Sequence, residues 1–383
     1  MNTQLYKNRF NTSALRVLLR PQQMGERSYL RYFVIVTNSL YPKQCKSLIV
    51  RLNEQLNLIP VPTLHNLSLR NISTSANKNN ATILNPWYLT GFSDAESSFM
   101  ISFYKDSTLK TVWRAKAIFS INLHIKDLAL LKRVQLSLGG VGSITNNGEN
   151  AMQLRVSSLP DLINVVIPHF ESYPLRTQKL ADFLLFKQAV EIMSRKEHLT
   201  IEGLHKILAI KASMNLGLSD SLKTAFCSGG NNIPSLPRPK IELLKEIDPN
   251  WLVGFVEGEG CFSVHVSKLA ASKLGFTAQI RFIVTQHSRD AELMKSLIDY
   301  FGCGQYQVRL GKSAGDFIVS RFSDIRDKII PFFDTYPLQG VKSLNFGDFR
   351  LAADIINVKG HLTKDGLDEI SFLKGRMNYL RTH

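Results

Sequence analysis

A thirteen-residue motif occurs twice in this chain, and its second copy follows the first by 163 positions. The first copy begins at Asn85 and reads NPWYLTGFSDAES, and the second begins at Asp248 and reads DPNWLVGFVEGEG. Each opens with an Asx-Pro pair, which is typical of a helix start because the Asx side chain caps free backbone N–H groups and proline suits the first turn. Each helix would end at a glutamate, Glu96 or Glu259. A duplicated helix of this kind indicates two halves that meet across a pseudo-two-fold axis, with both carboxylates near that axis.

The same spacing relates residues far beyond the motif. A solenoid unit has roughly 20 to 50 residues, whereas this period has the size of a domain. We therefore expect a first domain at 85–226, a linker at 227–247 that is rich in glycine and proline, and a second domain at 248–383. The further matched segments are His124 and Asp127 with His287 and Asp290, Tyr173-Pro174-Leu175 with Tyr336-Pro337-Leu338, Lys179 with Lys342, and His198-Leu199-Thr200 with His361-Leu362-Thr363.

The periodic patterns have the same order in both halves. After the motif helix come two strand-like runs, a helix that ends at a glycine, two short strands and further helices. This order predicts an α+β fold of two tandem pseudo-symmetric α-β-β-α-β-β-α domains with antiparallel sheets, and one further helix after each His-Leu-Thr. The expected long strands are 99–104, 112–123, 261–267 and 277–285, and the expected helices are 126–138, 159–170, 178–193, 289–301, 323–333 and 341–356.

Charge and composition narrow the class of partner. The formal net charge is +16, and residues 1–80, with 11 Lys/Arg and 2 Asp/Glu, carry +9 of it. A basic protein suits a polyanion such as nucleic acid, because phosphate neutralisation releases condensed counterions. No apolar run approaches the roughly 18 residues of a transmembrane helix, so we expect no membrane partner. The four cysteines have no paired spacing, so neither a zinc site nor a disulfide framework is indicated.

The first 80 residues differ in composition from the repeat. They are rich in Asn, Ser and Leu, and their opening stretch contains Lys7, Arg9, Arg16, Arg20, Arg27 and Arg31 against the single acid Glu26. This composition is similar to that of a mitochondrial presequence. An upstream in-frame segment or a disordered basic tail would have the same composition, and both alternatives stay open.

Residues 85–383 resemble the single-chain, two-motif LAGLIDADG homing endonucleases of fungal mitochondrial introns. The segments Leu89–Ser97 and Leu252–Gly260 carry the resemblance, together with the His-x-x-Asp, Tyr-Pro-Leu and His-Leu-Thr segments. The resemblance implies a mitochondrial enzyme that makes metal-dependent double-strand breaks in a long DNA target and so promotes mobility of its host intron. It also implies a monomer, with the two antiparallel sheets forming a DNA-binding saddle.

Small residues in the motif explain how its two acids could meet. Gly91 and Ala95 are four residues apart, as are Gly254 and Gly258, so each pair lies on one helix face. Small residues at this spacing let two helix backbones approach closely. Two acids brought together this way would repel each other, and a divalent cation would relieve the repulsion. The resemblance implies that Glu96 and Glu259 bind Mg²⁺, and oxygen ligands without a His/Cys cluster fit this metal.

The resemblance also implies roles for other residues. The backbone carbonyls of Ala95 and Gly258 would lie near the metals. Lys179 and Lys342 would line the cleavage pocket and stabilise developing phosphate charge, although a solvated lysine near a helix start is an equal alternative. Gln286 would position the attacking water, on one side only, because its matched position holds Leu123.

DNA reading would fall to alternating residues on the long strands. Side chains on one face of a strand recur every second residue, and arginine and glutamine are suited to guanine and adenine edges. Each could instead be an ordinary solvent-facing residue. The candidates are Ser102, Tyr104, Arg114, Lys116 and Ser120 in the first half, and His265, Ser267, Gln279 and Arg281 in the second.

The residue after the first acid and the basic N-terminal segment leave open two alternatives to an ordinary homing endonuclease. Gly260 follows the second acid, whereas Ser97 follows the first. If this position is left-handed, as at many helix ends, serine adopts it at a cost and the first site would be distorted. The basic N-terminal segment also keeps open an RNA maturase that assists splicing of its own intron, alone or alongside cleavage. The intact acids Glu96 and Glu259 favour cleavage.

Because the repeat begins near Asn85, we predict that deletion of residues 1–80 leaves DNA cleavage unchanged. The measurement is the cleavage rate of the truncated and full-length proteins on one substrate DNA. Loss of nicking in the truncated protein would show that the extension contributes to the nuclease.

Overall fold

The computed structural model describes residues 82–227, 233–242 and 246–381. The N-terminal extension at 1–80 and its three possible interpretations lie outside the described residues. Within the described part of the chain, no helix is both long enough and apolar enough to cross a membrane.

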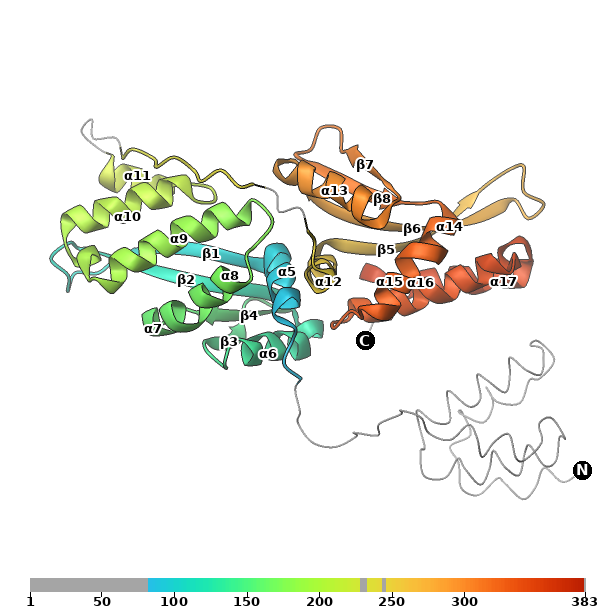
Figure 1. Ribbon diagram of the computed structural model, residues 1–383, viewed down its shortest axis with the longest axis horizontal. Helices are drawn as coiled ribbons and strands as arrows, with labels where there is room; N and C mark the ends of the chain where they lie inside the picture. The colour runs from blue at the N-terminus through green and yellow to red at the C-terminus, as the bar shows by residue number, and fades with distance from the viewer. Residues whose placement is uncertain (1–81, 228–232, 243–245, 382–383) are drawn as a thin grey trace, which may run out of the picture. The chain divides into compact units, whose positions relative to one another are not determined.

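The first half contains the elements expected from its sequence. A helix and two long strands are followed by a helix, two short strands and a helical layer (Figure 1). Helix α11 was not expected. The elements are α5 (Pro86–Glu96), β1 (Ser97–Lys105), β2 (Trp113–His124), η2 (Ile125–Asp127), α6 (Leu128–Ser137), β3 (Ser143–Asn146), β4 (Ala151–Val156), α7 (Leu159–Asp161), η3 (Leu162–Val166), α8 (Ile167–Ser172), α9 (Lys179–Ser194), η4 (Glu197–Leu199), α10 (Ile201–Ser213) and α11 (Asp220–Phe226).

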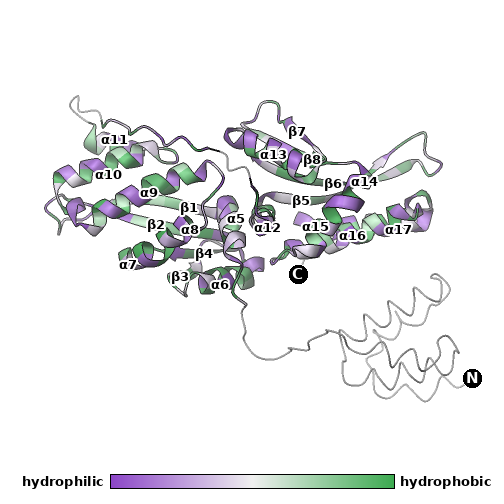
Figure 2. Cartoon of the chain, in the orientation of Figure 1, coloured by the Kyte–Doolittle hydropathy of each residue, from purple (hydrophilic) through white to green (hydrophobic). Residues whose placement is uncertain are grey.

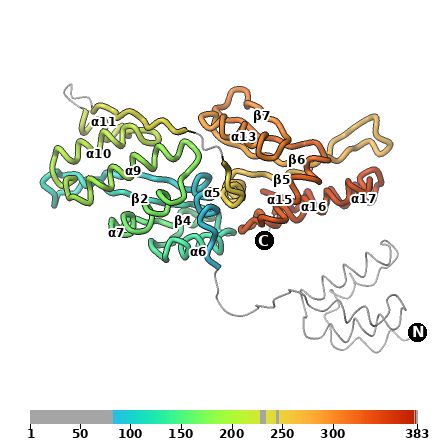
Figure 3. Tube along the Cα trace, viewed as in Figure 1, coloured from blue at the N-terminus to red at the C-terminus, as the bar shows by residue number. Residues whose placement is uncertain are grey.

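The second half repeats this order as far as α17 and then ends in η9, with no counterpart of α11 among the described residues; the linker joins α11 to α12 (Figure 3). Its elements are α12 (Pro249–Glu259), β5 (Gly260–Lys268), β6 (Phe276–His287), η6 (Ser288–Asp290), α13 (Ala291–Phe301), β7 (Gln305–Val308), β8 (Ala314–Val319), α14 (Phe322–Asp324), η7 (Ile325–Ile329), α15 (Ile330–Thr335), α16 (Lys342–Asn357), η8 (Gly360–Leu362), α17 (Lys364–Gly375) and η9 (Asn378–Leu380). The α+β fold and the duplicated order of elements are confirmed.

Each half contains one antiparallel sheet of four strands, in the orders β1-β2-β4-β3 and β5-β6-β8-β7. Alternation along the strands turns Phe99 and Phe119, and their counterparts Phe262 and Phe282, toward the helices. Phe99 packs edge-on against Phe170 of α8, with 5.3 Å between ring centroids. The covering helices have mixed surfaces, with hydrophobic and hydrophilic residues along the same helix (Figure 2). One face of each sheet therefore packs against the hydrophobic core, and the other face is not covered by these helices.

A wider turn interrupts the helix after β4 and after β8. Helical structure continues through α7, η3 and α8 in the first half, and η3 and its counterpart η7 have π-helical hydrogen bonding. Pro168 and Pro331 follow these segments directly at the start of α8 and α15. Proline has no N–H and its ring crowds the preceding turn, which accounts for the local widening.

The His-Leu-Thr segments form the corner between two helices. Lys196 and Lys359 precede this corner with left-handed backbones, at φ values of 59° and 58°. Thr200 then caps α10 by accepting a hydrogen bond from Gly203, and Thr363 caps α17 in the same way. These matched segments therefore shape the helical layer.

The two halves meet where α5 crosses α12, which lie side by side (Figure 1). A Cβ atom added to Gly91 would lie 1.9 Å from the carbonyl oxygen of Trp251, and one added to Gly254 would lie 2.1 Å from that of Tyr88. Since no side chain fits between them, the two helix backbones are in direct contact. Further along, a Cβ on Gly258 would lie 2.4 Å from the Cβ of Ala95. The structure thus places all four small residues at the crossing.

Two buried acids accept hydrogen bonds from the opposite helix at this crossing. Asp94 accepts a hydrogen bond from the Trp251 indole at 2.8 Å, and Glu257 accepts one from the Tyr88 hydroxyl at 2.9 Å. These pairs are equivalent by the repeat, since Asp94 matches Glu257 and Tyr88 matches Trp251. Hydrogen bonds to charged groups contribute about 1.5–3 kcal/mol each. Both acids therefore have a structural role at the crossing.

We predict that Gly91→Ala lowers the free energy of unfolding by about 1–3 kcal/mol or more, because the new methyl group must separate two backbones. Gly347→Ala is the matched control, since Gly347 is an exposed position of α16 and an added Cβ meets nothing within 4 Å. That change should raise stability by roughly 0.5–1 kcal/mol through helix propensity. Urea unfolding measures both. A harmless Gly91→Ala would mean that the helices are not packed backbone to backbone.

Candidate active site

Glu96 and Glu259 are the last residues of α5 and α12, and a strand begins at the next residue in each half. The residues after the acids are extended: Ser97 has φ −86° and ψ 161°, and Gly260 has φ −83° and ψ 152°. The expectation of a left-handed position that distorts the first site was therefore wrong. The chain passes straight from helix to strand, so serine meets no conformational cost here.

Glycine is needed at position 260 for a different reason. An added Cβ would lie 2.4 Å from Cγ1 of Val256 on the preceding turn. In the first half, Ser93 occupies the position equivalent to Val256, and the Ser97 hydroxyl donates to the Ser93 carbonyl at 2.6 Å. The smaller side chain at 93 thus makes room for the larger one at 97.

The crossing brings the two acidic side chains toward each other. The Glu96 Oε1 atom would lie 2.9 Å from a Cβ on Gly258, so this carboxylate lies against the last turn of the opposite helix, one residue from Glu259. Burial raises the pKa of both carboxyls, and the charge of Glu96 raises that of Glu259 further. Lys342 and Lys179 act in the opposite direction on both groups. The site therefore gathers negative charge that a bound cation would stabilise.

Both lysines reach the ends of the motif helices. The Lys179 ammonium donates to the carbonyls of Ser93 at 3.0 Å and Ala95 at 3.3 Å. The Lys342 ammonium donates to the carbonyls of Val256, Gly258 and Gly260 at 3.0, 2.8 and 2.6 Å. Burial lowers the pKa of each lysine, while the nearby carboxylates raise it. Neither is the solvated surface lysine of the alternative interpretation.

Gln286 lies next to one acid only. Its side-chain amide donates to Glu259 Oε1 at 3.4 Å, and its own Oε1 accepts from the His287 N–H at 2.8 Å. The equivalent Leu123 packs against the hydrophobic core. The site is therefore asymmetric at this position, as the sequence indicates.

The donor atoms around the acids fit a hard divalent cation. Two carboxylates and the carbonyls of Ala95 and Gly258 are all oxygen donors, and those carbonyls also accept from the lysines. Among the described residues, no group of three or more His, Cys, Asp or Glu side chains gathers to hold a metal ion. A cation bound here would thus need water or phosphate oxygens to complete its shell, as Mg²⁺ commonly does.

The candidate DNA-reading residues share the outer faces of the two sheets. Register pairs Ser102 with Lys116, Tyr104 with Arg114, and His265 with Gln279. Several are held by neighbours: Arg114 donates to Asp106 at 2.7 Å, and Arg281 to Gln279 at 2.9 Å. Ser267 is exposed.

Ser120 differs from the other candidates. It lies on the same face of β2, but it is fully buried and its hydroxyl has no hydrogen-bond partner. In this structure it therefore offers no surface to a base. Strand alternation alone cannot reveal this, because neighbouring side chains on the sheet decide what is covered.

Sequence patterns alone did not single out the polar residues of the outer strands. Arg309, just after β7, donates to Asp316 of β8 at 2.7 Å and to Thr285 of β6 at 2.9 Å. Arg155 of β4 lies opposite Ser120 and Ser143. Alternation in 151–156 and 314–319 could have indicated Arg155 and Asp316, but strands this short carry a weak signal.

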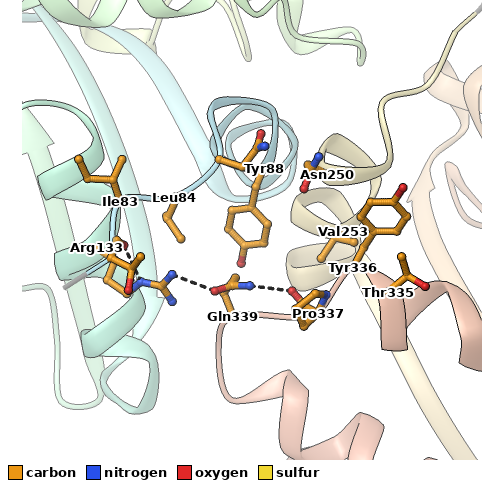
Figure 4. Close-up of a pocket in the computed structure, with 12 residues that line it drawn as sticks. Ile83, Leu84, Tyr88, Arg133, Asn250, Val253, Thr335, Tyr336, Pro337 and Gln339 are labelled. Atoms are coloured by element: carbon orange, nitrogen blue, oxygen red, sulfur yellow. Dashed lines mark hydrogen bonds between the residues drawn. The ribbon is translucent and has the colours of Figure 1, made fainter. Parts of the chain in front are cut away.

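A cavity of about 260 Å³ lies at the other end of the crossing (Figure 4). It is lined by Tyr88, Asn250 and Val253, from the first turns of α5 and α12, and by Arg133 and Gln339, which are hydrogen-bonded at 2.8 Å. The acids are about two to three helical turns away, at about 5.4 Å per turn. This cavity is therefore separate from the carboxylate site.

Comparison with known proteins agrees with this geometry. Residues 89–190 and 252–353 each match the family model described as LAGLIDADG endonuclease. The chain is 42% identical over 300 residues to probable intron-encoded endonuclease 3 of Neurospora crassa, a match that covers 78% of this chain and 55% of that protein. It is 38% identical over 340 residues to probable intron-encoded endonuclease 2 of the same fungus, covering 84% of this chain and 73% of that protein. The chain thus spans about half the length of the first of these relatives.

A solved structure is also similar. The I-SmaMI LAGLIDADG homing endonuclease bound to cleaved DNA matches with a TM-score of 0.75 and 44% identity, over 78% of this chain and 98% of that one. The same endonuclease has been solved bound to an uncleaved DNA target in the presence of calcium ions. The duplicated family match, the sequence identity and the shared fold show that this chain belongs to the LAGLIDADG endonuclease family.

Proposed function

We propose that this protein is a site-specific, Mg²⁺-dependent homing endonuclease that makes double-strand breaks in a long DNA target and promotes mobility of its host intron. One observation carries the proposal: both acids and both lysines are present where α5 and α12 end. Similarity to intron-encoded endonucleases and to a DNA-bound homing endonuclease supports it.

In this proposal Glu96 and Glu259 bind Mg²⁺, with the carbonyls of Ala95 and Gly258 as further oxygen donors. The metal would polarise the scissile phosphates and lower the pKa of bound water. Lys179 and Lys342 keep the helix ends in place and stabilise the negative charge that develops on phosphate. Gln286 orients water on the Glu259 side. Hydrolysis of one strand in each half then gives the double-strand break.

The outer faces of the sheets are the proposed DNA surface. The residues we assign to base or phosphate contacts are Ser102, Tyr104, Arg114 and Lys116 in the first half, and His265, Ser267, Gln279 and Arg281 in the second. A net charge of +16 supports strong, salt-dependent attraction to the phosphate backbone. Since one chain supplies both motif helices, we infer that the enzyme acts as a monomer.

A mitochondrial location is part of the proposal. Its support is the relatives' description as intron-encoded, together with the presequence-like composition of residues 1–80. The maturase alternative is not favoured. A splicing factor needs no paired acids at a helix crossing, and the relatives are described as endonucleases.

We predict that Glu96→Gln abolishes double-strand cleavage while target affinity stays within about a few-fold, since most of the binding free energy comes from phosphate and base contacts. The substrate is a duplex selected with the wild-type protein from a randomised library in Mg²⁺. Glu369→Gln, at an exposed position of α17, is the matched control and should cleave normally. A Glu96→Gln variant that still cuts both strands would refute the assigned role, and a wild-type protein that cuts no library member would refute the proposed function.

We predict that Glu259→Gln stabilises the metal-free protein at pH 7, measured as a higher melting temperature than that of the wild type. The pKa of Glu259 is raised in the folded state, so ionising this group above its ordinary pKa of 4.5 costs stability, and a neutral amide avoids that cost. The gain should disappear below pH 4.5, where the carboxyl is protonated in both states. Mg²⁺ should raise the melting temperature of the wild type but not of the variant. An equal response to Mg²⁺ in both proteins would exclude Glu259 as a metal ligand.

A further inference from the structure

Two matched aspartates bind across the boundary between the halves. Asp127, in η2 of the first half, accepts a hydrogen bond from the backbone N–H of Val341 in the second half, at 2.8 Å. Asp290, in η6 of the second half, accepts one from the N–H of Gln178 in the first half, at 2.6 Å. The two contacts are equivalent by the repeat, and each aspartate belongs to a matched His-x-x-Asp segment. No role in the proposed function has yet been assigned to them.

Each contact is made one residue before a lysine of the site. Val341 is the residue that precedes α16, which begins at Lys342, and Gln178 is the residue that precedes α9, which begins at Lys179. A lysine at the start of a helix is unfavourable against the helix dipole, and a carboxylate there is favourable. The aspartate of one half thus stabilises the helix start from which the other half's lysine extends.

The space around Gly340 shows how closely this segment is held. A Cβ added there would lie 2.7 Å from Asp127 Oδ1 and 2.9 Å from Glu257 Oε1. The backbone therefore passes directly between an acid of the first half and an acid of the second. From this point the Lys342 side chain reaches three carbonyls at the end of α12. A small shift at Val341 would move the ammonium relative to all three.

We propose that Asp127 and Asp290 are positioning residues that act on the opposite half. Asp127 fixes the position of Lys342, and Asp290 fixes the position of Lys179. Each half then holds the lysine of the other half in its working position. This inference rests on the proposed endonuclease function. It extends that function, because cleavage in each half then depends on correct packing of the two halves. The helix start that carries each lysine gains its aspartate hydrogen bond only when the opposite half is in place.

The test exploits the two strands of the target. The selected duplex carries a different fluorophore on each strand, and cleavage of each strand is timed separately in Mg²⁺. Lys342→Met and Lys179→Met first establish which strand depends on each lysine. Asp127→Ala should then slow the strand that Lys342→Met slows, by on the order of tenfold to a hundredfold, as expected for a misplaced catalytic group. Asp290→Ala should slow the other strand. The unaffected strand should stay within about threefold of wild type.

Three controls separate positioning from general destabilisation. Asp127→Asn and Asp290→Asn keep an oxygen acceptor and should restore the wild-type strand ratio. Glu202→Ala and Asp365→Ala remove an exposed acid from the first turn of α10 and α17, at equivalent positions of the two halves, and should change neither strand. Gly340→Ala disturbs the same contact from the opposite side and should slow the Lys342 strand, so it replaces Asp127→Ala if that variant fails to fold.

The outcomes are distinct. Equal slowing of both strands in folded Asp127→Ala, or slowing of the Lys179 strand, would overturn the assignment to the opposite half while leaving the endonuclease function intact. If the wild-type protein cleaves neither strand of any selected duplex, the proposed function itself fails. Slowing of opposite strands by the two aspartate variants would establish the inference.

Discussion

Direct contact between the backbones of α5 and α12 is the constraint on which the rest of the structure depends. Gly91 and Gly254 each face a carbonyl oxygen of the opposite helix at a distance that admits no Cβ. Both helices have 11 residues and both end in glutamate, so a symmetric crossing necessarily brings the two acids to the same place. The two sheets begin at the next residue, and the crossing therefore also determines where each sheet starts.

Close packing concentrates charge around this crossing, and the structure compensates for it locally. The inner acids Asp94 and Glu257 bind aromatic donors of the opposite helix, and the outer acids Glu96 and Glu259 lie near two lysines. The halves have diverged in matched sets. Asp94 accepts from Trp251 and Thr177, whereas Glu257 accepts from Tyr88 and lies against the loop at Gly340. Such substitutions preserve the contact because the partner changes with the residue.

Prediction from sequence succeeded where a periodic pattern repeats over many residues. The long strands, the motif helices and the small residues on the facing sides of these helices were predicted in this way. Alternation and helical spacing indicate which face of an element is buried. It failed at single positions. The left-handed conformation expected at Gly260 was wrong, because the strand starts there and the glycine serves a steric contact with Val256. The burial of Ser120 was not foreseen, since its covering comes from side chains on neighbouring strands.

The sequence by itself determined the duplication, the order of elements, the two family motifs and the acid that ends each motif. It could do so because a repeat of this length constrains every matched position at once. Only the tertiary structure decided that Lys179 and Lys342 reach the ends of the motif helices, and that Asp127 and Asp290 bind in the opposite half. These contacts join residues between 82 and 214 positions apart in the chain. No local pattern encodes such pairs. The lysine contacts form only when each half folds, and the aspartate contacts form only when the two halves pack against each other.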